Sequence, residues 1–182
     1  MVSKCDPSFF VYKDKGHIIY ILVYVDDIII TGNSNVIIQQ LTTKLDSNFS
    51  LKQLGKLDYF LGIEIKSVAD GIILLTQSKY IRDLLQKTKM AEAQFISSPK
   101  TANCKLTKVD LDFFSNPSLY RSVVGALQYT TITRPELSYA VNKVCQFMAH
   151  PMDSDWTAVK HILSYLKGFI RHGLHFIVSP SS

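Results

Sequence analysis

The sequence predicts an α+β fold, with a β-rich N-terminal part that carries one helix and a helical C-terminal part. Residues 9–31 are dense in β-branched and aromatic residues, and turn signals at residues 14–16 and 25–26 divide them into three antiparallel strands. From residue 78 onward, apolar residues recur at helical spacing between capping residues. The 182 residues are 47% hydrophobic and 19% charged, which is enough apolar material to bury a core.

The first three strands are predicted at residues 9–13, 17–24 and 27–31. Their apolar runs are nearly continuous instead of alternating, so we expect both faces of this sheet to be covered. A helix over residues 36–49 follows, because its apolar residues lie at helical spacing and Asn33 or Ser34 is placed to cap it. This helix is expected to pack on the sheet.

A second hairpin is predicted from strands at residues 59–66 and 72–76, with its turn at Asp70 and Gly71. Gly62 lies inside the first of these strands. Because glycine weakens a strand, it marks either a bulge or a place where another backbone comes close. Both interpretations of Gly62 remain open from the residues alone.

Four helices and a last strand are predicted after this hairpin, each bounded by capping or helix-breaking residues. Ser78 is placed to cap the first helix, and Asn116 and Pro117 start the second. Residues 133–135 start the third, and Asp153 or Ser154 is placed to cap the fourth. The second ends near residue 132, the third near residue 148 and the fourth at Gly168. Residues 91–116 are polar and poorly periodic, so we expect them to form a connector. A last strand is predicted at residues 173–178, and no later strand follows that could pair with it.

Charge is distributed unevenly along a chain whose net charge is +5. Residues 1–75 hold 7 Lys and Arg against 8 Asp and Glu, whereas residues 76–182 hold 13 against 7. A basic half after a near-neutral half suits a nucleic-acid binder with a cation-holding site at one end, and it equally suits a solvated basic surface.

The cysteines and the most apolar segment indicate the type of compartment in which the chain is expected. Cys5, Cys104 and Cys145 are odd in number and far apart, which argues against a disulfide framework or a zinc site and favours a reducing intracellular compartment, cytoplasmic or nuclear. Residues 18–30 are apolar but too short to cross a bilayer, and two carboxylates make insertion costly. We therefore expect no membrane partner.

Asp26 and Asp27 stand side by side within the apolar run YILVYVDDIIITG. Adjacent ionised carboxylates repel each other, and burial makes the repulsion stronger. One interpretation is a hydrated hairpin turn, where Asp is common. The other is a divalent cation site, because Mg²⁺ takes a few carboxylate oxygens and keeps waters and substrate phosphates as its other ligands.

The surroundings of this pair resemble the reverse transcriptase domain of copia-type retrotransposon Pol polyproteins. The matching stretches come in the family's order at residues 22–32, 54–65, 71–85, 119–142 and 156–168. The resemblance implies part of a right-hand polymerase fold: an antiparallel palm sheet with a packed helix, then a helical thumb-like region. It assigns residues 1–75 to a partial palm with two hairpins, residues 76–170 to thumb and connection helices, and residues 171–182 to a truncated strand towards an RNase H domain.

The implied activity is RNA-directed DNA polymerisation, a nucleotidyltransferase reaction in which three carboxylates hold two Mg²⁺ or Mn²⁺ ions at the primer 3′ end. Asp26 and Asp27 match two of these catalytic carboxylates, with Asp26 the firmer metal ligand. Tyr24 and Val25 match positions that touch the primer terminus and the incoming nucleotide. Ordinary strand packing is the alternative for Tyr24 and Val25.

Two further motifs match substrate-binding elements of the family. YFLGIEI resembles the primer grip, a hairpin whose backbone meets the primer end, which would explain a glycine at Gly62. RSVVGALQY resembles a thumb helix that follows the duplex minor groove, with Arg121, Gly125 and Tyr129 near one helical face. Arginine and an aromatic ring beside a glycine suit contact with a sugar-phosphate backbone. The alternative for Gly125 is a close helix–helix contact.

The expected partners are a template–primer duplex and nucleotide triphosphates. In the family, the third carboxylate and the fingers lie upstream of the YVDD hairpin, so a missing N-terminal palm and fingers and an RNase H domain are expected partners too. We expect the chain alone to hold metal weakly and to show little or no polymerase activity. The alternatives are a residual non-specific nucleic-acid-binding fragment and an inert retroelement remnant.

Overall fold

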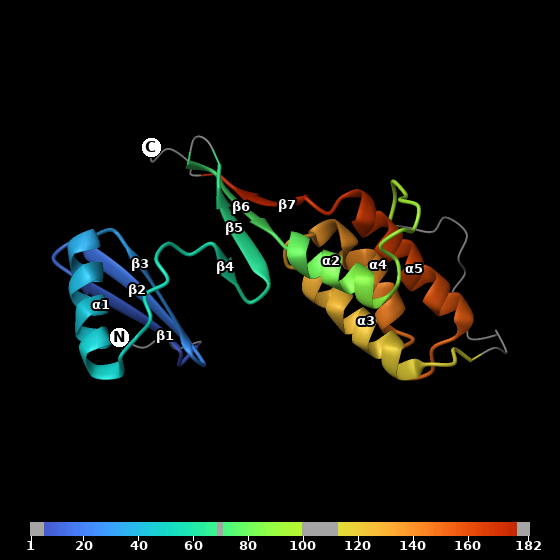
Figure 1. The fold of residues 1–182 in the computed structure, drawn as a ribbon, viewed down its shortest axis with the longest axis horizontal. Coiled ribbons are helices and arrows are strands. Elements are labelled where there is room, and N and C mark those ends of the chain that lie inside the picture. The colour runs from blue at the N-terminus through green and yellow to red at the C-terminus, as the bar shows by residue number, and fades with distance from the viewer. Residues whose placement is uncertain (1–5, 69–70, 100–112, 178–182) are drawn as a thin grey trace. The chain divides into compact units, whose positions relative to one another are not determined.

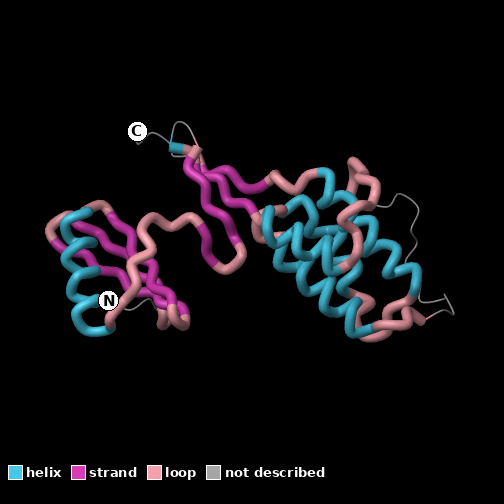
Figure 2. The backbone as a smooth tube through the Cα atoms, in the orientation of Figure 1, coloured by secondary structure: helices cyan, strands magenta, loops and turns pink. Residues whose placement is uncertain are grey.

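The computed structural model describes residues 6–68, 71–99 and 113–177. The chain forms two compact units, Met1–Leu57 and Asp58–Ser182, and each is described by itself (Figures 1 and 2). Its class is α+β with antiparallel sheets, as predicted. The sequence-based boundary after residue 75 differs from this division, because the second hairpin groups with the helices.

The first unit contains one antiparallel sheet and one helix (Figure 1). Its elements are β1 (Phe9–Asp14), β2 (His17–Tyr24), β3 (Asp27–Gly32) and α1 (Asn35–Phe49). The strands pair in the order β1-β2-β3 through two-residue turns, with Asp14 opposite His17 and Tyr24 opposite Asp27. The three predicted strands and the helix are confirmed to within one residue.

The prediction that both faces of this sheet are covered is wrong for the described residues. Ile19 is buried, but the other side chains of the three strands are half-buried or exposed, and Tyr20 and Tyr24 are exposed. The cause is that this unit supplies one helix, α1, whose apolar residues such as Leu41 and Leu45 are themselves only half-buried.

The second unit contains a four-stranded antiparallel sheet and a group of helices (Figure 2). Its strands, in the order in which they pair, are β4 (Tyr59–Phe60), β5 (Ile63–Ser67), β6 (Ile73–Thr76) and β7 (Gly173–Phe176). Its helices are α2 (Ser78–Lys87), α3 (Pro117–Thr130), a 3-10 turn (Pro135–Leu137), α4 (Ser138–Cys145) and α5 (Asp153–Gly168).

One strand prediction is wrong in this unit. The strand predicted at residues 59–66 is divided into β4 and β5 by a turn at Leu61 and Gly62, whose φ angles are 48° and 83°. Positive φ at both positions is what a two-residue type I′ hairpin turn requires. Gly62 therefore lies in a turn and not in a strand bulge. The last predicted strand is confirmed as β7, and its partner is β6 from earlier in the chain.

The core of the second unit lies among its four α-helices. Apolar residues of α3 and α5 recur at helical spacing, and this periodicity buries one face of each helix. The fully buried members are Ile81, Tyr120, Val123, Val124, Leu127, Leu137, Val159, Leu163 and Leu166. Burying one such side chain contributes about 1.5–3 kcal/mol, so this cluster dominates the stability of the unit. Trp156 of α5 stacks on Phe114 at 4.8 Å between ring centroids.

The predicted start of α3 is confirmed. Asn116 accepts a hydrogen bond of 2.9 Å from the Leu119 backbone N–H, and Pro117 occupies the first helical position. The Ser78 prediction is wrong, because Gln77 occupies the cap position of α2 and the Ser78 hydroxyl donates instead to a carbonyl beyond α5.

The predicted cap of α5 at Asp153 or Ser154 is also wrong. Met152 occupies the cap position, and its backbone N–H donates to the Asp155 carboxylate at 2.9 Å. An acidic residue in the first turn satisfies an unpaired donor and also suits the positive end of the helix dipole.

A buried polar junction joins the beginning of α2, the α3–α4 loop and the end of α5. Gln77 accepts a hydrogen bond of 2.7 Å from the Thr133 hydroxyl, and its amide nitrogen donates to the Tyr129 carbonyl at 3.4 Å. The Ser78 hydroxyl donates to the Ile170 carbonyl at 3.1 Å. These bonds fix segments that are distant in sequence.

Arg134 is the charged member of this junction and is 1% exposed. Its Nη1 donates to the Phe169 carbonyl at 2.8 Å, and its Nε pairs with Glu136 at 2.6 Å. The guanidinium also lies 5.6 Å from the centre of the Tyr165 ring. A cation at the C-terminal end of α5 complements the negative end of that helix dipole.

Within the described part of the chain, no helix combines the length and apolar character needed to cross a membrane.

Candidate functional site

The two adjacent carboxylates lie at the turn between β2 and β3. Val25 and Asp26 are the two turn residues, and Asp27 is the first residue of β3, opposite Tyr24. Val25 has a φ of 51° and is 82% exposed, whereas Asp26 is outside the left-handed region. A β-branched residue with positive φ is a strained outlier, and such outliers cluster at functional sites.

Asp26 and Asp27 are both exposed, and no hydrogen bond or ion pair of either carboxylate occurs among the described residues. Two neighbouring carboxylates on a short turn, with open space around them, suit Mg²⁺, which keeps waters or phosphates as its other ligands. Nowhere in residues 6–68, 71–99 and 113–177 do three potential ligands from Asp, Glu, His and Cys come together.

The strain at Val25 gives a direct test. Replacing Val25 with glycine removes the left-handed penalty of about 1–2 kcal/mol, although part of the gain is offset by the greater freedom of glycine in the unfolded chain. We expect the β2–β3 hairpin to become more stable by about 1 kcal/mol, measured as slower amide exchange in β2 and β3. Val23→Gly, near the end of β2, should instead speed this exchange, and equal effects of both changes would contradict the proposal that Val25 is strained.

The turn at Leu61 and Gly62 contacts two tyrosines of the helices. The Tyr129 hydroxyl donates a hydrogen bond to the Leu61 carbonyl. A Cβ placed on Gly62 would lie 3.5 Å from a Tyr129 ring carbon and 3.6 Å from a Tyr80 ring carbon. The structure therefore brings together Gly62 and Tyr129, two residues that the sequence predicted as substrate contacts.

A second contact ties the same hairpin to α2. Glu64 accepts a hydrogen bond of 2.8 Å from the backbone N–H of Lys79 and forms an ion pair of 2.8 Å with Lys66. Burial raises the pKa of Glu64, but the hydrogen bonds from Lys66 and Lys79 and the charges of Lys66 and Arg82 outweigh it, so the pKa is lowered. The carboxylate is thus held in its charged form at the positive end of α2.

The exposed side of α3 carries the remaining predicted contacts. Arg121 is exposed and lies near Ser118, with 3.4 Å between Nη2 and Oγ. A Cβ built on Gly125 would meet nothing within 4 Å. The alternative that Gly125 makes a close helix–helix contact is therefore wrong for the described residues, and its surface is open to a ligand.

Gly125 gives a second test. Alanine is favoured over glycine inside a helix by about 1 kcal/mol, and the open space around Gly125 accommodates the added methyl group. We expect Gly125→Ala to raise the free energy of unfolding by about this amount in urea titrations. We also expect it to weaken binding of an RNA–DNA hybrid several-fold, because a methyl group keeps the sugar-phosphate backbone away. Gln86→Ala, at an exposed position of α2, is the control. An unchanged affinity in Gly125→Ala would argue against the approach of a duplex to Gly125.

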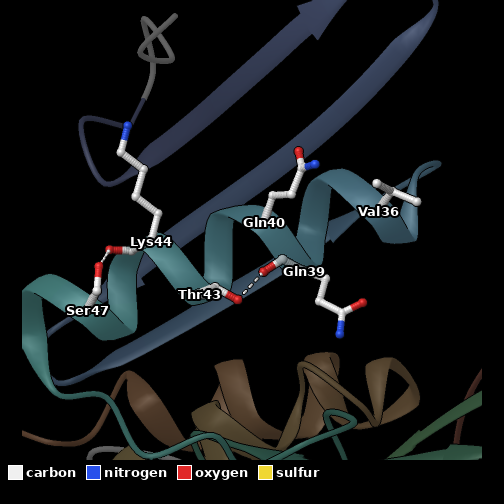
Figure 3. Close-up of a pocket in the computed structure, with 6 residues that line it drawn as sticks. All are labelled: Val36, Gln39, Gln40, Thr43, Lys44 and Ser47. Atoms are coloured by element: carbon white, nitrogen blue, oxygen red, sulfur yellow. Dashed lines mark hydrogen bonds between the residues drawn. The ribbon is translucent and has the colours of Figure 1, made fainter.

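A shallow hollow runs along the exposed side of α1, and all of its lining residues belong to that helix (Figure 3). They are Val36, Gln39, Gln40, Thr43, Lys44 and Ser47. The Thr43 and Ser47 hydroxyls donate to the Gln39 and Lys44 carbonyls of the same helix. No carboxylate is among these six lining residues.

Sequence reasoning missed Tyr80 and Glu64 as supports of the second hairpin. Both act across the fold, Tyr80 through the Tyr129 ring and Glu64 through the beginning of α2. No periodic pattern or short motif in the sequence signals contacts between distant segments. The hydrogen bond between Tyr129 and Leu61, for example, joins residues that are 68 positions apart.

The family described as reverse transcriptase (RNA-dependent DNA polymerase) matches residues 4–102. The chain is 45% identical over 172 residues to a retrovirus-related Pol polyprotein from transposon RE2 of Arabidopsis thaliana, covering 94% of this chain and 12% of that protein. It is also 45% identical over 156 residues to the uncharacterized mitochondrial protein AtMg00810 of the same plant, covering 86% of this chain and 64% of that protein.

A more distant relative is the putative transposon Ty5-1 protein YCL074W of Saccharomyces cerevisiae, which is 30% identical over 149 residues, or 81% of this chain and 48% of that protein. The chain thus spans about an eighth of the transposon RE2 polyprotein and just under two thirds of the mitochondrial protein. No solved structure matches it.

Proposed function

Because the chain belongs to the reverse transcriptase family of copia-type retrotransposon polyproteins, we propose that it supplies part of the active site and of the primer-holding surface of an RNA-directed DNA polymerase. The observation that carries this proposal is the strained, exposed β2–β3 turn, which presents Asp26 and Asp27 together. Its partners in this role are a template–primer duplex and nucleotide triphosphates.

Asp26 and Asp27 are the proposed catalytic and metal-holding residues. A bound Mg²⁺ or Mn²⁺ would supply an activated primer hydroxyl and stabilise charge on the transferred phosphate. The chain's own contribution is to fix the backbone that carries the two carboxylates through the two-residue turn. Tyr24 and Val25 on the same turn are exposed and are proposed to lie against the primer end and the incoming nucleotide.

The proposed nucleic-acid contacts lie in the second unit. Residues 58–182 hold 14 of the 20 Lys and Arg against 10 of the 15 Asp and Glu, and phosphate neutralisation dominates such binding. Arg121 and Gly125 are proposed to meet the duplex backbone along α3. Gly62 is proposed to meet the primer at the tip of the second hairpin, where glycine adds no side chain.

The test is a chimaeric polyprotein in which residues 6–177 of this chain replace the matching segment of the transposon RE2 polyprotein. We expect RNA-templated primer extension within about tenfold of the parent polyprotein, because the two segments are 45% identical. Loss of extension in a folded chimaera would overturn the proposal. The 182-residue chain alone is assayed beside it, where we propose little or no extension, since no third carboxylate joins Asp26 and Asp27 among the described residues.

A second candidate is non-specific nucleic-acid binding without catalysis, which the exposed Arg121 and the open Gly125 favour. In that case the chain alone binds an RNA–DNA hybrid with an affinity that falls steeply with salt. A flat salt response would count against both the binding role and the primer-holding part of the first proposal.

A further inference from the structure

The turn at Leu61 and Gly62 is held in a conformation that its sequence does not favour. Leu61 has a φ of 48°, a region that L-residues other than glycine, asparagine and aspartate seldom adopt. Its side chain is exposed, so burial of the leucine does not explain the turn. A strained backbone persists when its surroundings fix it, and those surroundings must come from elsewhere in the fold.

The first restraint is a hydrogen bond to the backbone of the turn. The Tyr129 hydroxyl, from the last turn of α3, donates to the Leu61 carbonyl. Because the acceptor is a main-chain carbonyl, the bond fixes the backbone of the turn and not a side chain of the tip.

The second restraint is a pair of aromatic rings beneath the turn. Tyr80 meets Tyr129 edge to face, with 5.2 Å between ring centroids and 69° between ring planes. Both rings would be in van der Waals contact with a Cβ on Gly62. The Tyr80 ring therefore limits the movement of the Tyr129 ring, and the two rings together form the surface on which the turn rests.

The rest of the hairpin is anchored independently of these tyrosines. Glu64 of β5 accepts from the Lys79 N–H at the beginning of α2, and the Ile65 N–H donates to the Asp58 carbonyl at 2.7 Å. Loss of the Tyr129 bond should therefore free the turn while β5 stays in its sheet.

We propose that Tyr129 and Tyr80 are positioning residues, which hold the turn at Leu61 and Gly62 at a fixed place on α3, one helical turn from Gly125. The inference rests on the proposed function, in which the turn meets the primer end and α3 meets the duplex. In this proposal Tyr129 sets the distance between the primer contact of the turn and the duplex contact of α3, because its hydroxyl and its ring both contact the hairpin.

The first arm of the test uses the free chain. Tyr129→Phe keeps the ring and removes the hydroxyl, and Tyr20→Phe in the first unit is the matched control. We expect amide exchange at Ile63, which pairs with Phe60 across the turn, to accelerate about fivefold in Tyr129→Phe alone, with unchanged exchange in α5. Tyr80→Leu should have the same local effect. Unchanged exchange at Ile63 in Tyr129→Phe would overturn the inference.

The second arm uses an RNA template annealed to a DNA primer that carries a photoreactive base at its 3′ end. In the wild-type chain we expect crosslinks confined to two peptides, the one that contains the β2–β3 turn and the one that contains the Leu61 turn. In Tyr129→Phe we expect them to spread to neighbouring peptides, while overall affinity and its salt dependence stay unchanged. If Tyr129→Phe only destabilised the fold, the affinity for the duplex would fall while the crosslinks stayed confined to the same peptides as in the wild-type chain. If the wild-type chain binds no duplex, the proposed function fails, and the exchange arm still decides whether Tyr129 fixes the turn.

Discussion

Replacing Asp26 with asparagine in the chimaeric polyprotein is expected to lower RNA-templated primer extension about a thousandfold. A metal ion contributes several kcal/mol of transition-state stabilisation, and each 1.36 kcal/mol is a factor of ten in rate. Asparagine keeps the size of the side chain and removes its charge, so the turn should be retained. Asp27→Asn should lower extension less, because the resemblance implies that Asp26 is the firmer metal ligand.

Asp14 provides the matched control for this change. It is an exposed carboxylate beside the β1–β2 turn of the same sheet, where it accepts a hydrogen bond from the Tyr12 hydroxyl at 3.3 Å. Asp14→Asn should leave extension within about twofold of the unsubstituted chimaera, since surface substitutions seldom change stability by more than about 0.5 kcal/mol. Equal losses in Asp14→Asn and Asp26→Asn would show that the assay reports folding and not the carboxylate pair.

Arg134→Ala is expected to lower the free energy of unfolding of the second unit by about 3 kcal/mol. The change removes a charged hydrogen bond to Phe169 and the contact with the Tyr165 ring, and it leaves a cavity in a buried junction. The ion pair adds little to this figure, because the Glu136 side chain is 42% exposed and solvent screens it.

Two comparisons separate charge from volume in this prediction. Arg134→Met fills most of the space without a charge and should lose less stability than Arg134→Ala, since a buried ion pair is often replaced by apolar residues at small cost. Arg171→Ala, at an exposed position, should stay within about 0.5 kcal/mol of the wild-type chain. Urea titrations monitored by the fluorescence of Trp156 measure all three, and a loss in Arg134→Ala no larger than in Arg171→Ala would contradict the role of the junction.

Local chemistry made the first unit and the start of α3 predictable. β2 was predicted with its observed bounds, because its β-branched and aromatic residues end at a short turn on either side. Asn116 followed by Pro117 marks a helix start by its own side-chain and ring geometry. Such signals depend on neighbours in sequence and need no knowledge of the rest of the fold.

Contacts between distant segments were not predictable in the same way. Residues 59–66 look like one strand because their apolar and aromatic residues are continuous, and nothing local announces a leucine at positive φ. The turn depends on Tyr129, which is 68 residues away. Likewise, a lone arginine such as Arg134 is expected at the surface, and only the end of α5 explains its burial.

For the candidate site, too, local motifs were predictable and contacts between distant residues were not. The YVDD motif identified Asp26 and Asp27 from four letters and their apolar surroundings, and the structure places both at one exposed turn. Their role as metal ligands remains a prediction. The YFLGIEI and RSVVGALQY motifs predicted Gly62 and Tyr129 as substrate contacts, but their contact with each other, and the support from Tyr80, came only from the fold.

The central claim is that the β2–β3 turn binds a divalent cation, and Mn²⁺ titration of the isotopically labelled chain tests it most directly. Paramagnetic broadening should first affect the amide signals of Tyr24, Val25 and Ile28, at millimolar Mn²⁺, and should be lost in the double variant Asp26→Asn, Asp27→Asn. Mg²⁺ in excess should reverse it, because both ions take oxygen ligands. Broadening that begins elsewhere, or that survives the double substitution, would contradict the account.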